Sequence, residues 1–446
     1  MRCPRIMIAA PSSGSGKTLT TCGILQALVN RKLKTASFKC GPDYIDPMFH
    51  SRIIGAKSKN LDAFFLKEND LRYIFSRSAE GYDISVVEGV MGFYDGIKVD
   101  SSEASSYDVS IKTGTPVILL IDSRGASLST LPVLKGFLDY RKNNIKGVIF
   151  NRMSEKVFKM IAPEAEKLGV KAIGYVPKVS DLVLESRHLG LVLPGEIENL
   201  KDKLNKLADV LERTLDIDSL IKIANEAPDI EGEPPEIPQT AGKTRIGLAD
   251  DDAFCFIYED NVDLLKRMGA EIVRFSPLKD KKLPDVDGIM LPGGYPELHA
   301  KELEDNAAMR EDIKNKLDAG MPCMAECGGF MYLHTMMTNK EGMTYCMCNV
   351  IDGDSKNMSK LTRFGYATFE SKSSGIWCKG HEFHYWDSDN CGSDWKAKKP
   401  SGLEYRCIHD DGRIIAGFPH LYYYSNPDIA AEFIGRCLEY KSKIAL

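Results

Sequence analysis

Residues Pro11–Thr18 read PSSGSGKT, and this stretch decides how the first half of the chain folds. It departs at one position from the phosphate-binding pattern G-x-x-x-x-G-K-[ST], because Pro11 stands where the first glycine is usual. The apolar run Ile6–Ala10 predicts a buried strand before it, and Lys17–Asn30 predicts a helix after it. A loop between a strand and a helix N-terminus binds phosphate through backbone N–H groups. We therefore predict a nucleotide site rather than a serine-rich turn, formed by Ser13, Gly14, Ser15, Gly16, Lys17 and Thr18.

Short apolar runs alternate with longer helical stretches on both sides of a polar segment. The first set of strands is expected at Thr35–Lys39, Ile84–Glu88, Val117–Asp122, Lys146–Asn151 and Lys171–Val176. The second set is expected at Arg245–Ala249, Glu271–Phe275, Gly288–Leu291 and Met321–Ala325. Such alternation indicates parallel sheets covered by helices, which is an α/β fold. Between residues 364 and 424 the runs become short and aromatic, including RIIAGFPHLYYY, and favour antiparallel strands.

The polar segment 226–243, EAPDIEGEPPEIPQTAGK, contains four prolines and five acidic residues. This composition is typical of a linker. A chain of 446 residues is also long for a single core. We therefore expect an ATP-dependent domain at 1–225, a linker at 226–243 and a second domain at 244–446.

Composition narrows the class of protein. The net charge of -5 does not suggest a nucleic-acid or acidic-membrane partner. No apolar run approaches the roughly 20 residues of a membrane span, so a cytoplasmic protein is expected. The twelve cysteines include no CxxC pair, and we interpret most of them as reduced thiols rather than zinc ligands.

Charged residues follow two expected strands of the first domain. Lys39, Asp43 and Asp46 come just after the second strand, and Glu88 ends the next one. The carboxyl ends of parallel strands meet at the edge where ligands bind. We expect Thr18 and Glu88 to bind Mg²⁺ that accompanies ATP, with Asp43 and Asp46 divided between metal and substrate and Lys39 beside the nucleotide.

A second site is expected around Cys327 in Ala325–Gly329, AECGG. A nucleophile with small residues before and after it, between a strand and a helix, is typical of a nucleophile elbow. The helix N-terminus is expected to lower the pKa of the Cys327 thiol. Backbone N–H groups of Gly328 and of Gly294, in the turn PGGY, are candidates for an oxyanion hole. The alternative is a buried core cysteine.

A thiol nucleophile needs a base, and three histidines follow strands late in the chain. His420 comes after the last apolar strand and is our preferred base. His381 and His384 alternate on an aromatic strand, and we interpret them as structural or facing the acceptor.

Together these motifs resemble those of the cobyrinic acid a,c-diamide synthases, glutamine-hydrolysing amidoligases of corrinoid biosynthesis. The resemblance spans nearly the whole chain, through FKCGPDYIDPMFH, VVEGVMGFYDG, ESRHLGLVLPGE, PGGYPELHAKEL, AECGGFMYL, GHEFHYW and HLYYYSNP. It implies a P-loop domain similar to dethiobiotin synthetase, followed by a class I glutamine amidotransferase-like domain. By position it implies nucleotide and Mg²⁺ roles for Lys17, Thr18 and Glu88, acceptor binding by Asp43, Tyr44 and Asp46, and a catalytic pair of Cys327 and His420.

Two positions depart from the family pattern. Tyr422 stands where many relatives have a second histidine, which favours His420 as the base. The acid that orients the base in ordinary triads has no evident place, and we leave it unassigned.

The resemblance implies ATP, L-glutamine and cobyrinic acid as substrates, with the a- and c-acetate carboxylates amidated through an acyl phosphate. Three alternatives stay open: a sister enzyme that amidates nickel-sirohydrochlorin, cobyric acid synthase, and a MinD-like partitioning ATPase. The loops at Asp43 and at 88–96 argue against cobyric acid synthase. Ser12, where partitioning ATPases place a lysine, and the elbow at Cys327 argue against the ATPase. The sequence does not determine the oligomeric state, and a homodimer stays open.

Overall fold

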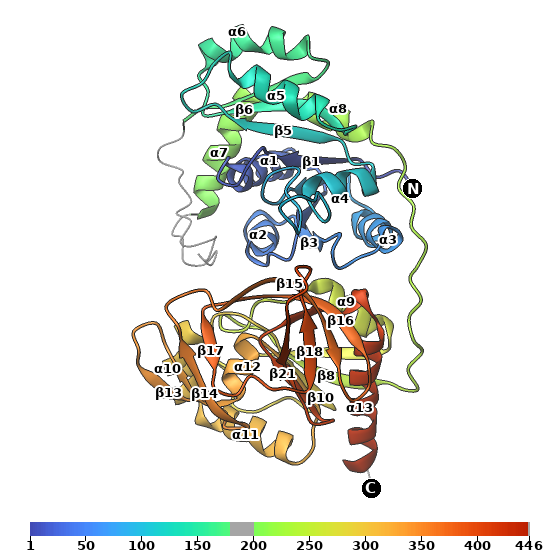
Figure 1. Cartoon of the computed structure of the whole chain (residues 1–446), viewed down its shortest axis with the longest axis vertical. Coiled ribbons are helices and arrows are strands. Elements are labelled where there is room, and N and C mark those ends of the chain that lie inside the picture. Colours follow the sequence, from blue (N-terminus) through green and yellow to red (C-terminus); the bar gives the residue numbers. More distant parts are fainter. Residues whose placement is uncertain (179–199, 445–446) are drawn as a thin grey trace. The chain divides into compact units, whose positions relative to one another are not determined.

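The computed structural model describes residues 1–178 and 200–444. The chain forms two compact units, Met1–Pro235 and Glu236–Leu446, which run from blue to green and from yellow to red in Figure 1. The segment 226–243 contains neither helix nor strand. The motif ESRHLGLVLPGE, at 185–196, lies outside the described residues. No helix in the described part of the chain is long and apolar enough to cross a membrane.

The first unit is built on a seven-stranded sheet of order β3-β2-β4-β1-β5-β6-β7, in which all neighbours pair in parallel. Its strands are β1 (Arg5–Ala9), β2 (Thr35–Cys40), β3 (Lys57–Leu61), β4 (Ile84–Glu88), β5 (Val117–Asp122), β6 (Ile145–Asn151) and β7 (Lys171–Val176). The expected parallel sheet is confirmed. Strand β3 was not expected, because its sequence KSKNL is polar, yet four of its five residues are buried.

The helices of this unit cover both faces of the sheet. They are α1 (Lys17–Asn30), α2 (Ile45–Met48), α3 (Glu68–Ala79), α4 (Ser106–Thr113), α5 (Thr130–Asp139), α6 (Glu155–Glu166), α7 (Leu200–Thr214) and α8 (Ile217–Asn225), with a π-helical turn at Phe49–Ile54. The connections β1-α1-β2 and β4-α4-β5 run in opposite directions along the sheet. Because such crossovers are right-handed, α1 and α4 lie on opposite faces. The connections reverse between β1 and β4, and ligands bind in such sheets beside the carboxyl ends of the strands at this point.

The second unit contains a six-stranded sheet of order β20-β21-β11-β10-β8-β9. Its strands are β8 (Thr244–Ala249), β9 (Ala270–Phe275), β10 (Gly288–Leu291), β11 (Cys323–Glu326), β20 (His409–Asp410) and β21 (Ile414–Gly417). The expectation of an antiparallel strand at the run RIIAG is wrong in one respect. Strand β21 pairs in parallel with β11 and only its other neighbour, β20, is antiparallel. The sheet therefore places the residues after β21 beside the end of β11.

The aromatic region forms the expected antiparallel sheet, of order β19-β18-β15-β16-β22. Its strands are β15 (Arg363–Ser371), β16 (Trp377–His384), β18 (Trp395–Lys398), β19 (Glu404–Cys407) and β22 (His420–Tyr422). A further four-stranded sheet was not expected, and it consists of β12 (His334–Thr338), β13 (Thr344–Cys346), β14 (Ile351–Asn357) and β17 (Trp386–Ser388). The helices of the unit are α9 (Glu259–Arg267), α10 (Ala300–Asp305), α11 (Ala307–Asp318), α12 (Gly328–Leu333) and α13 (Asp428–Ile444).

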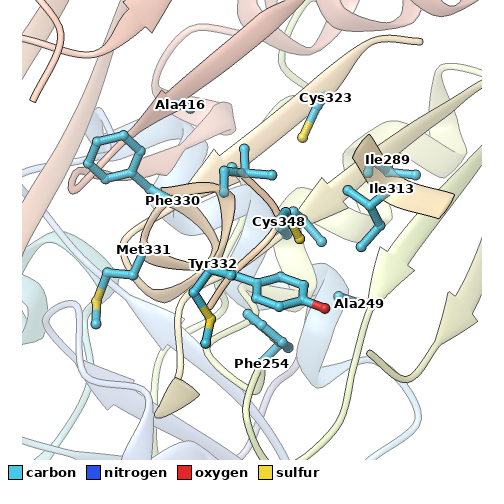
Figure 2. Packing of buried hydrophobic residues seen from close by; sticks show 14 of the residues in the cluster. Ala249, Phe254, Ile289, Ile313, Cys323, Phe330, Met331, Tyr332, Cys348 and Ala416 are labelled. Atoms are coloured by element: carbon cyan, nitrogen blue, oxygen red, sulfur yellow. The ribbon is translucent and has the colours of Figure 1, made fainter. Parts of the chain in front are cut away.

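Helix α12 lies inside the core of the second unit, and all its residues are buried. Figure 2 shows Phe330, Met331 and Tyr332 of this helix among the buried side chains of the core. At its start the backbone runs so close to β10 that a Cβ atom on Gly329 would lie 1.9 Å from the carbonyl oxygen of Leu291. Glycine is therefore required there, and the turn before α12 is fixed against the end of β10.

Candidate active sites

The phosphate loop joins β1 to α1, as expected. Gly14 and Gly16 have φ angles of 73° and 93°, a region that favours glycine. Ser15 Oγ donates a hydrogen bond of 2.9 Å to the carbonyl of Ser12, inside the loop. Asn151, at the end of β6, donates a bond of 2.7 Å to the carbonyl of Ser15. Ser13 and Gly14 form the exposed outer part of the loop.

Lys17 is buried and folds back over the loop. Its Nζ donates to the carbonyl of Ser12 at 3.1 Å and to that of Met91 in the loop after β4. Burial, and then repulsion by the neighbouring Lys39, lower the pKa of Lys17 to about 8. The ammonium is therefore held by two neutral carbonyls, and an anionic phosphate would be a stronger partner.

Thr18, Lys39, Asp46 and Glu88 form one cluster beside the carboxyl ends of β1, β2 and β4. Thr18 Oγ1 donates to Glu88 Oε1 at 2.7 Å, and Lys39 Nζ lies 2.7 Å from the same oxygen. Lys39 Nζ also lies 2.5 Å from Asp46 and 4.0 Å from Asp43. Burial disfavours charge on Lys39, but Asp46, Glu88 and Asp43 outweigh it and raise the pKa of Lys39 well above its usual value. Burial works against charge on Glu88 as well, but Lys39 and His50 hold its pKa below its usual range.

The loop before α2 carries Asp43 and Tyr44. The Asp43 side chain is about one-third exposed, and its Oδ1 accepts a bond of 2.9 Å from the N–H of Ile45. Tyr44 is buried at the start of α2. Asn60 of β3 donates to the carbonyls of Gly41 and Asp43, at 2.9 and 2.7 Å. Strand β3 thus fixes the backbone of the loop and leaves the Asp43 carboxylate partly exposed.

His50 belongs to the same cluster, and sequence reasoning missed it. Its Nε2 lies 3.3 Å from Glu88 Oε2, and its Nδ1 lies 2.6 Å from Ser37 Oγ. His50 ends the motif FKCGPDYIDPMFH, so a signal was present. The sequence did not indicate the π-helical turn at Phe49–Ile54, which places His50 next to Glu88.

The oxygen atoms of this cluster suit Mg²⁺. Within residues 1–178 and 200–444, no three His, Cys, Asp or Glu side chains form a complete metal site. A nucleotide-bound Mg²⁺ does not need one, because it takes one or two protein oxygens and completes its shell with phosphates and water. The Thr18 hydroxyl and the Glu88 carboxylate already meet at 2.7 Å, and Asp46 lies on the other side of Lys39.

Cys327 occupies a sharp turn between β11 and α12. It is a non-glycine residue with φ 46° and ψ -103°, and its N–H donates to the carbonyl of Gly417 at 2.8 Å. Such a strained angle is typical of a nucleophile elbow. The expected lowering of its pKa is wrong: burial, and then the Glu297 carboxyl, raise the pKa of the Cys327 thiol. A thiol in this state needs a base to become a nucleophile.

The turn after β10 lies between the elbow and His420. A Cβ atom on Gly328 would lie 3.1 Å from the backbone nitrogen of Gly294, and one on Gly293 would lie 2.4 Å from Cε1 of His420. The two N–H groups expected to form an oxyanion hole therefore belong to adjacent stretches of backbone. The same turn contacts the imidazole ring of His420.

His420 begins β22 and stacks on His381 of β16. The two residues are register partners, and their rings lie 4.9 Å apart at 17°. Burial lowers the pKa of His381 to about 3, and burial followed by the nearby His381 lowers that of His420 well below its usual value. A neutral imidazole can accept a proton, as a general base must. His384 instead stacks on Phe418, with the rings 4.0 Å apart.

Glu326, directly before the nucleophile, reaches the histidine segment. Its Oε1 accepts a bond of 3.2 Å from the N–H of Leu421, and its Oε2 lies 3.8 Å from Nδ1 of His420. Both side chains are buried. Tyr422 points elsewhere, since its hydroxyl donates to Asp260 at 2.9 Å. Sequence reasoning left the acid of this site unassigned.

Comparisons with known proteins match both units. Residues 6–192 match the CobQ/CobB/MinD/ParA nucleotide binding domain, and residues 245–427 match the CobB/CobQ-like glutamine amidotransferase domain. Cobyrinate a,c-diamide synthase of Listeria innocua is 38% identical, with 97% of this chain and 99% of that protein covered. Those of Picrophilus torridus and Caldanaerobacter subterraneus are 38% and 36% identical, with 98% and 99% of this chain and 99% and 100% of the relatives covered. The chain belongs to the cobyrinate a,c-diamide synthase family.

Membership of the cobyrinate a,c-diamide synthase family confirms three expectations. The fold is a P-loop nucleotide-binding domain followed by a glutamine amidotransferase domain. The protein is a ligase that takes its amido group from glutamine. The presence of a nucleotide-binding domain agrees with the use of ATP. The roles of individual residues remain predictions.

Proposed function

We propose that the protein amidates the a- and c-acetate carboxylates of cobyrinic acid, with ATP for activation and glutamine as the nitrogen source. The observation that carries the proposal is that one chain contains both kinds of site. In the first, Thr18 of the phosphate loop donates to Glu88. In the second, the strained elbow at Cys327 packs against the 293–294 turn, which contacts the buried His420. Relatives that match over nearly their full length are named cobyrinate a,c-diamide synthases.

In the second unit, Cys327 would release ammonia from glutamine. His420 takes the proton of the thiol, and the sulfur attacks the side-chain carboxamide carbon of glutamine. Gly294 and Gly328 donate backbone N–H groups to the developing oxyanion. As the C–N bond breaks, His420 returns the proton to the departing nitrogen, and ammonia leaves. Water then hydrolyses the thioester to give glutamate and the free thiol.

In the first unit, a carboxylate would be activated before it meets ammonia. An acetate oxygen of the macrocycle attacks the γ-phosphorus of ATP, which yields an acyl phosphate and ADP. Ammonia attacks the acyl carbon and phosphate leaves, so that an amide remains. Backbone N–H groups of residues 13–16 and the Lys17 ammonium would hold the phosphates, while Asp43, Tyr44 and Asp46 contact the acceptor.

Mg²⁺ bound to Thr18 and Glu88, with Asp46 nearby, would neutralise the phosphate charge. Without the ion, Lys39 forms ion pairs with Asp46 and Glu88. When Mg²⁺ binds these carboxylates, the Lys39 ammonium would turn towards the phosphates of the nucleotide. The donor set of one hydroxyl and two carboxylates is the hard-oxygen set that Mg²⁺ prefers.

The experiment is a two-substrate amidation assay. Two reactions are prepared, and both contain the protein, ATP, Mg²⁺ and glutamine. One receives cobyrinic acid and the other receives nickel-sirohydrochlorin, and each product is analysed by mass spectrometry. Each amidation replaces a hydroxyl by an amino group, and two rounds are expected with cobyrinic acid. Turnover of the nickel compound alone would replace our substrate by that of the sister enzyme. Absence of both ligase and glutaminase activity would contradict the proposal as a whole.

A further inference from the structure

We propose that Glu326 is the positioning residue of His420, so that the acid of the amidotransferase site comes from the residue directly before the nucleophile. This inference rests on the proposed roles of Cys327 and His420. Sequence reasoning assigned no acid to the site, and the geometry points to this one.

The two oxygens of the Glu326 carboxyl face two consecutive residues of the histidine segment. Oε1 accepts the N–H of Leu421 at 3.2 Å, which fixes the plane of the carboxyl group. Oε2 then lies 3.8 Å from Nδ1 of His420. The remaining ring nitrogen, Nε2, is the one that must exchange a proton with the thiol. A carboxyl on Nδ1 sets this tautomer and stabilises the imidazolium that forms.

Glu326 also lines a small cavity, together with Phe256, Tyr258, Met324 and Tyr423. Its side chain therefore has open space beside it. The shift from 3.8 Å to a hydrogen bond of about 3 Å is the kind of tightening that catalytic contacts undergo when substrate binds.

Two other acids of this unit, Asp260 and Glu382, have partners of their own. Asp260 accepts a hydrogen bond from the hydroxyl of Tyr422 at 2.9 Å. Glu382 accepts a bond from the Tyr405 hydroxyl and lies 3.6 Å from both Arg363 and His384. The Glu326 carboxyl lies within 4 Å of a ring nitrogen of His420.

The charge state of Glu326 agrees with this role. Burial raises its pKa to about 8, so the carboxyl is mostly neutral near pH 7 while His420 is also neutral. Proton transfer from Cys327 forms an ion pair between the thiolate and the His420 imidazolium, and the neutral carboxyl can accept the Nδ1–H of the ring through its carbonyl oxygen. The site would therefore contain no unpaired buried charge before the reaction or during it.

The test compares Glu326→Gln and Glu326→Ala with the unchanged protein. The amide introduced by E326Q keeps an oxygen for the Leu421 N–H, but it then presents an NH₂ donor to Nδ1 of His420 and favours the wrong tautomer of the ring. We expect E326Q to lower kcat for glutamine hydrolysis roughly 100-fold with little change in KM. Ammonia-supported amidation should stay at the unchanged level. A matched control is Glu311→Gln, an acid exposed on α11, which should alter neither activity.

The outcomes separate this inference from the proposed function. If the unchanged protein shows no glutaminase that depends on Cys327, the proposed function fails and the inference with it. If that glutaminase is present and E326Q keeps full kcat, the inference alone is overturned. A higher KM with an unchanged kcat also overturns the inference. Such a result would indicate damage to the glutamine pocket rather than to the base. E326A lacks the bond to Leu421 as well, so E326Q decides if E326A does not fold.

Discussion

At the residue scale, Cys327 combines chemical and conformational demands at one position. Its φ of 46° is unfavourable for any side chain, while a structural cysteine would need no such angle. We expect Cys327→Ala to lower glutamine-dependent amidation by about 10³-fold or more, because no other nucleophile replaces the thiol. Amidation with a high concentration of ammonia should persist. Both reactions are followed by product mass under the same conditions.

The backbone strain at Cys327 provides an internal control. Cys327→Gly should be as inactive with glutamine as Cys327→Ala, but more stable towards urea by about 1 kcal/mol, because glycine adopts a positive φ at little cost. Equal stability of the two variants would show that the turn is not strained. Loss of ammonia-supported amidation in both would contradict the assignment of the two reactions to separate sites.

Lys17 gives the nucleotide site a pH dependence whose sign can be stated. Its pKa is lowered to about 8 in the free protein, and the charged form is the one that binds phosphate. Below pH 8 the ammonium is already present, so affinity for MgATP should vary little. Above pH 8 binding must first restore the proton, and affinity should fall by up to about tenfold per pH unit. Calorimetric titration at pH 7, 8 and 9 measures this.

A variant without an ionisable group isolates that effect. Lys17→Met should bind MgATP weakly at every pH, without the fall above pH 8. If the unchanged protein and K17M show the same slope, another group controls the pH dependence and the role of Lys17 is contradicted.

Single residues differed in how well the sequence predicted them. The sequence predicted the positions of the phosphate loop, Glu88 and the elbow, because each stands at a strand end with glycines beside it. It did not indicate the positions of His50 and Glu326, because these depend on contacts between distant residues: His50 Nε2 lies 3.3 Å from Glu88 Oε2, and Glu326 Oε2 lies 3.8 Å from His420 Nδ1. The pKa of Cys327 was predicted with the wrong sign, because burial outweighs the effect of a helix N-terminus.

At the scale of elements, the packing of α12 against β10 sets the position of the elbow. A Cβ atom on Gly329 would lie 1.9 Å from a backbone oxygen, which cannot move without disturbing the sheet. We expect Gly329→Ala to lower the free energy of unfolding of the second unit by about 1 to 3 kcal/mol and to reduce glutaminase activity. Urea unfolding and glutamine hydrolysis measure the two effects.

Gly435→Ala is the matched control for Gly329→Ala. Gly435 lies in α13, and a Cβ atom there would meet nothing within 4 Å. Alanine should stabilise that helix by about 0.5 to 1 kcal/mol and leave activity unchanged. Equal stability of the two variants would show that the contact between α12 and β10 can relax.

Elements with a clear apolar pattern were predicted, and polar strands were not. Buried runs such as Ile84–Glu88 and Gly288–Leu291 appear as strands at the expected residues. Strand β3 has a polar sequence, and one of its polar residues, Asn60, holds the loop of Asp43 through two hydrogen bonds that an apolar side chain cannot make. Strand β21 was expected to be antiparallel because it lies among short aromatic runs, but it pairs in parallel with β11. A four-residue apolar run does not indicate the direction of its partner.

At the scale of the whole molecule, the proposed function divides one reaction between two units. Glu88→Gln should abolish amidation with either nitrogen source, because the carboxylate next to Thr18 no longer carries a charge for Mg²⁺. Glutamine hydrolysis should continue at least in part, since Cys327 and His420 belong to the other unit. Unchanged ligase activity would refute the metal assignment.

A mixture of the two single variants asks whether ammonia passes directly between the active sites of one chain. Cys327→Ala is expected to keep its ligase activity and Glu88→Gln at least part of its glutaminase activity, so together they should supply both activities on separate chains. If ammonia is delivered within a chain, the mixture should use glutamine poorly at low concentration, and added free ammonia should restore its rate. If ammonia escapes to solvent, the mixture should approach half the rate of the unchanged protein at equal total concentration. Addition of glutamate dehydrogenase with its co-substrates, which consumes free ammonia, separates the cases: it should suppress the mixture and spare the unchanged protein only when transfer is direct.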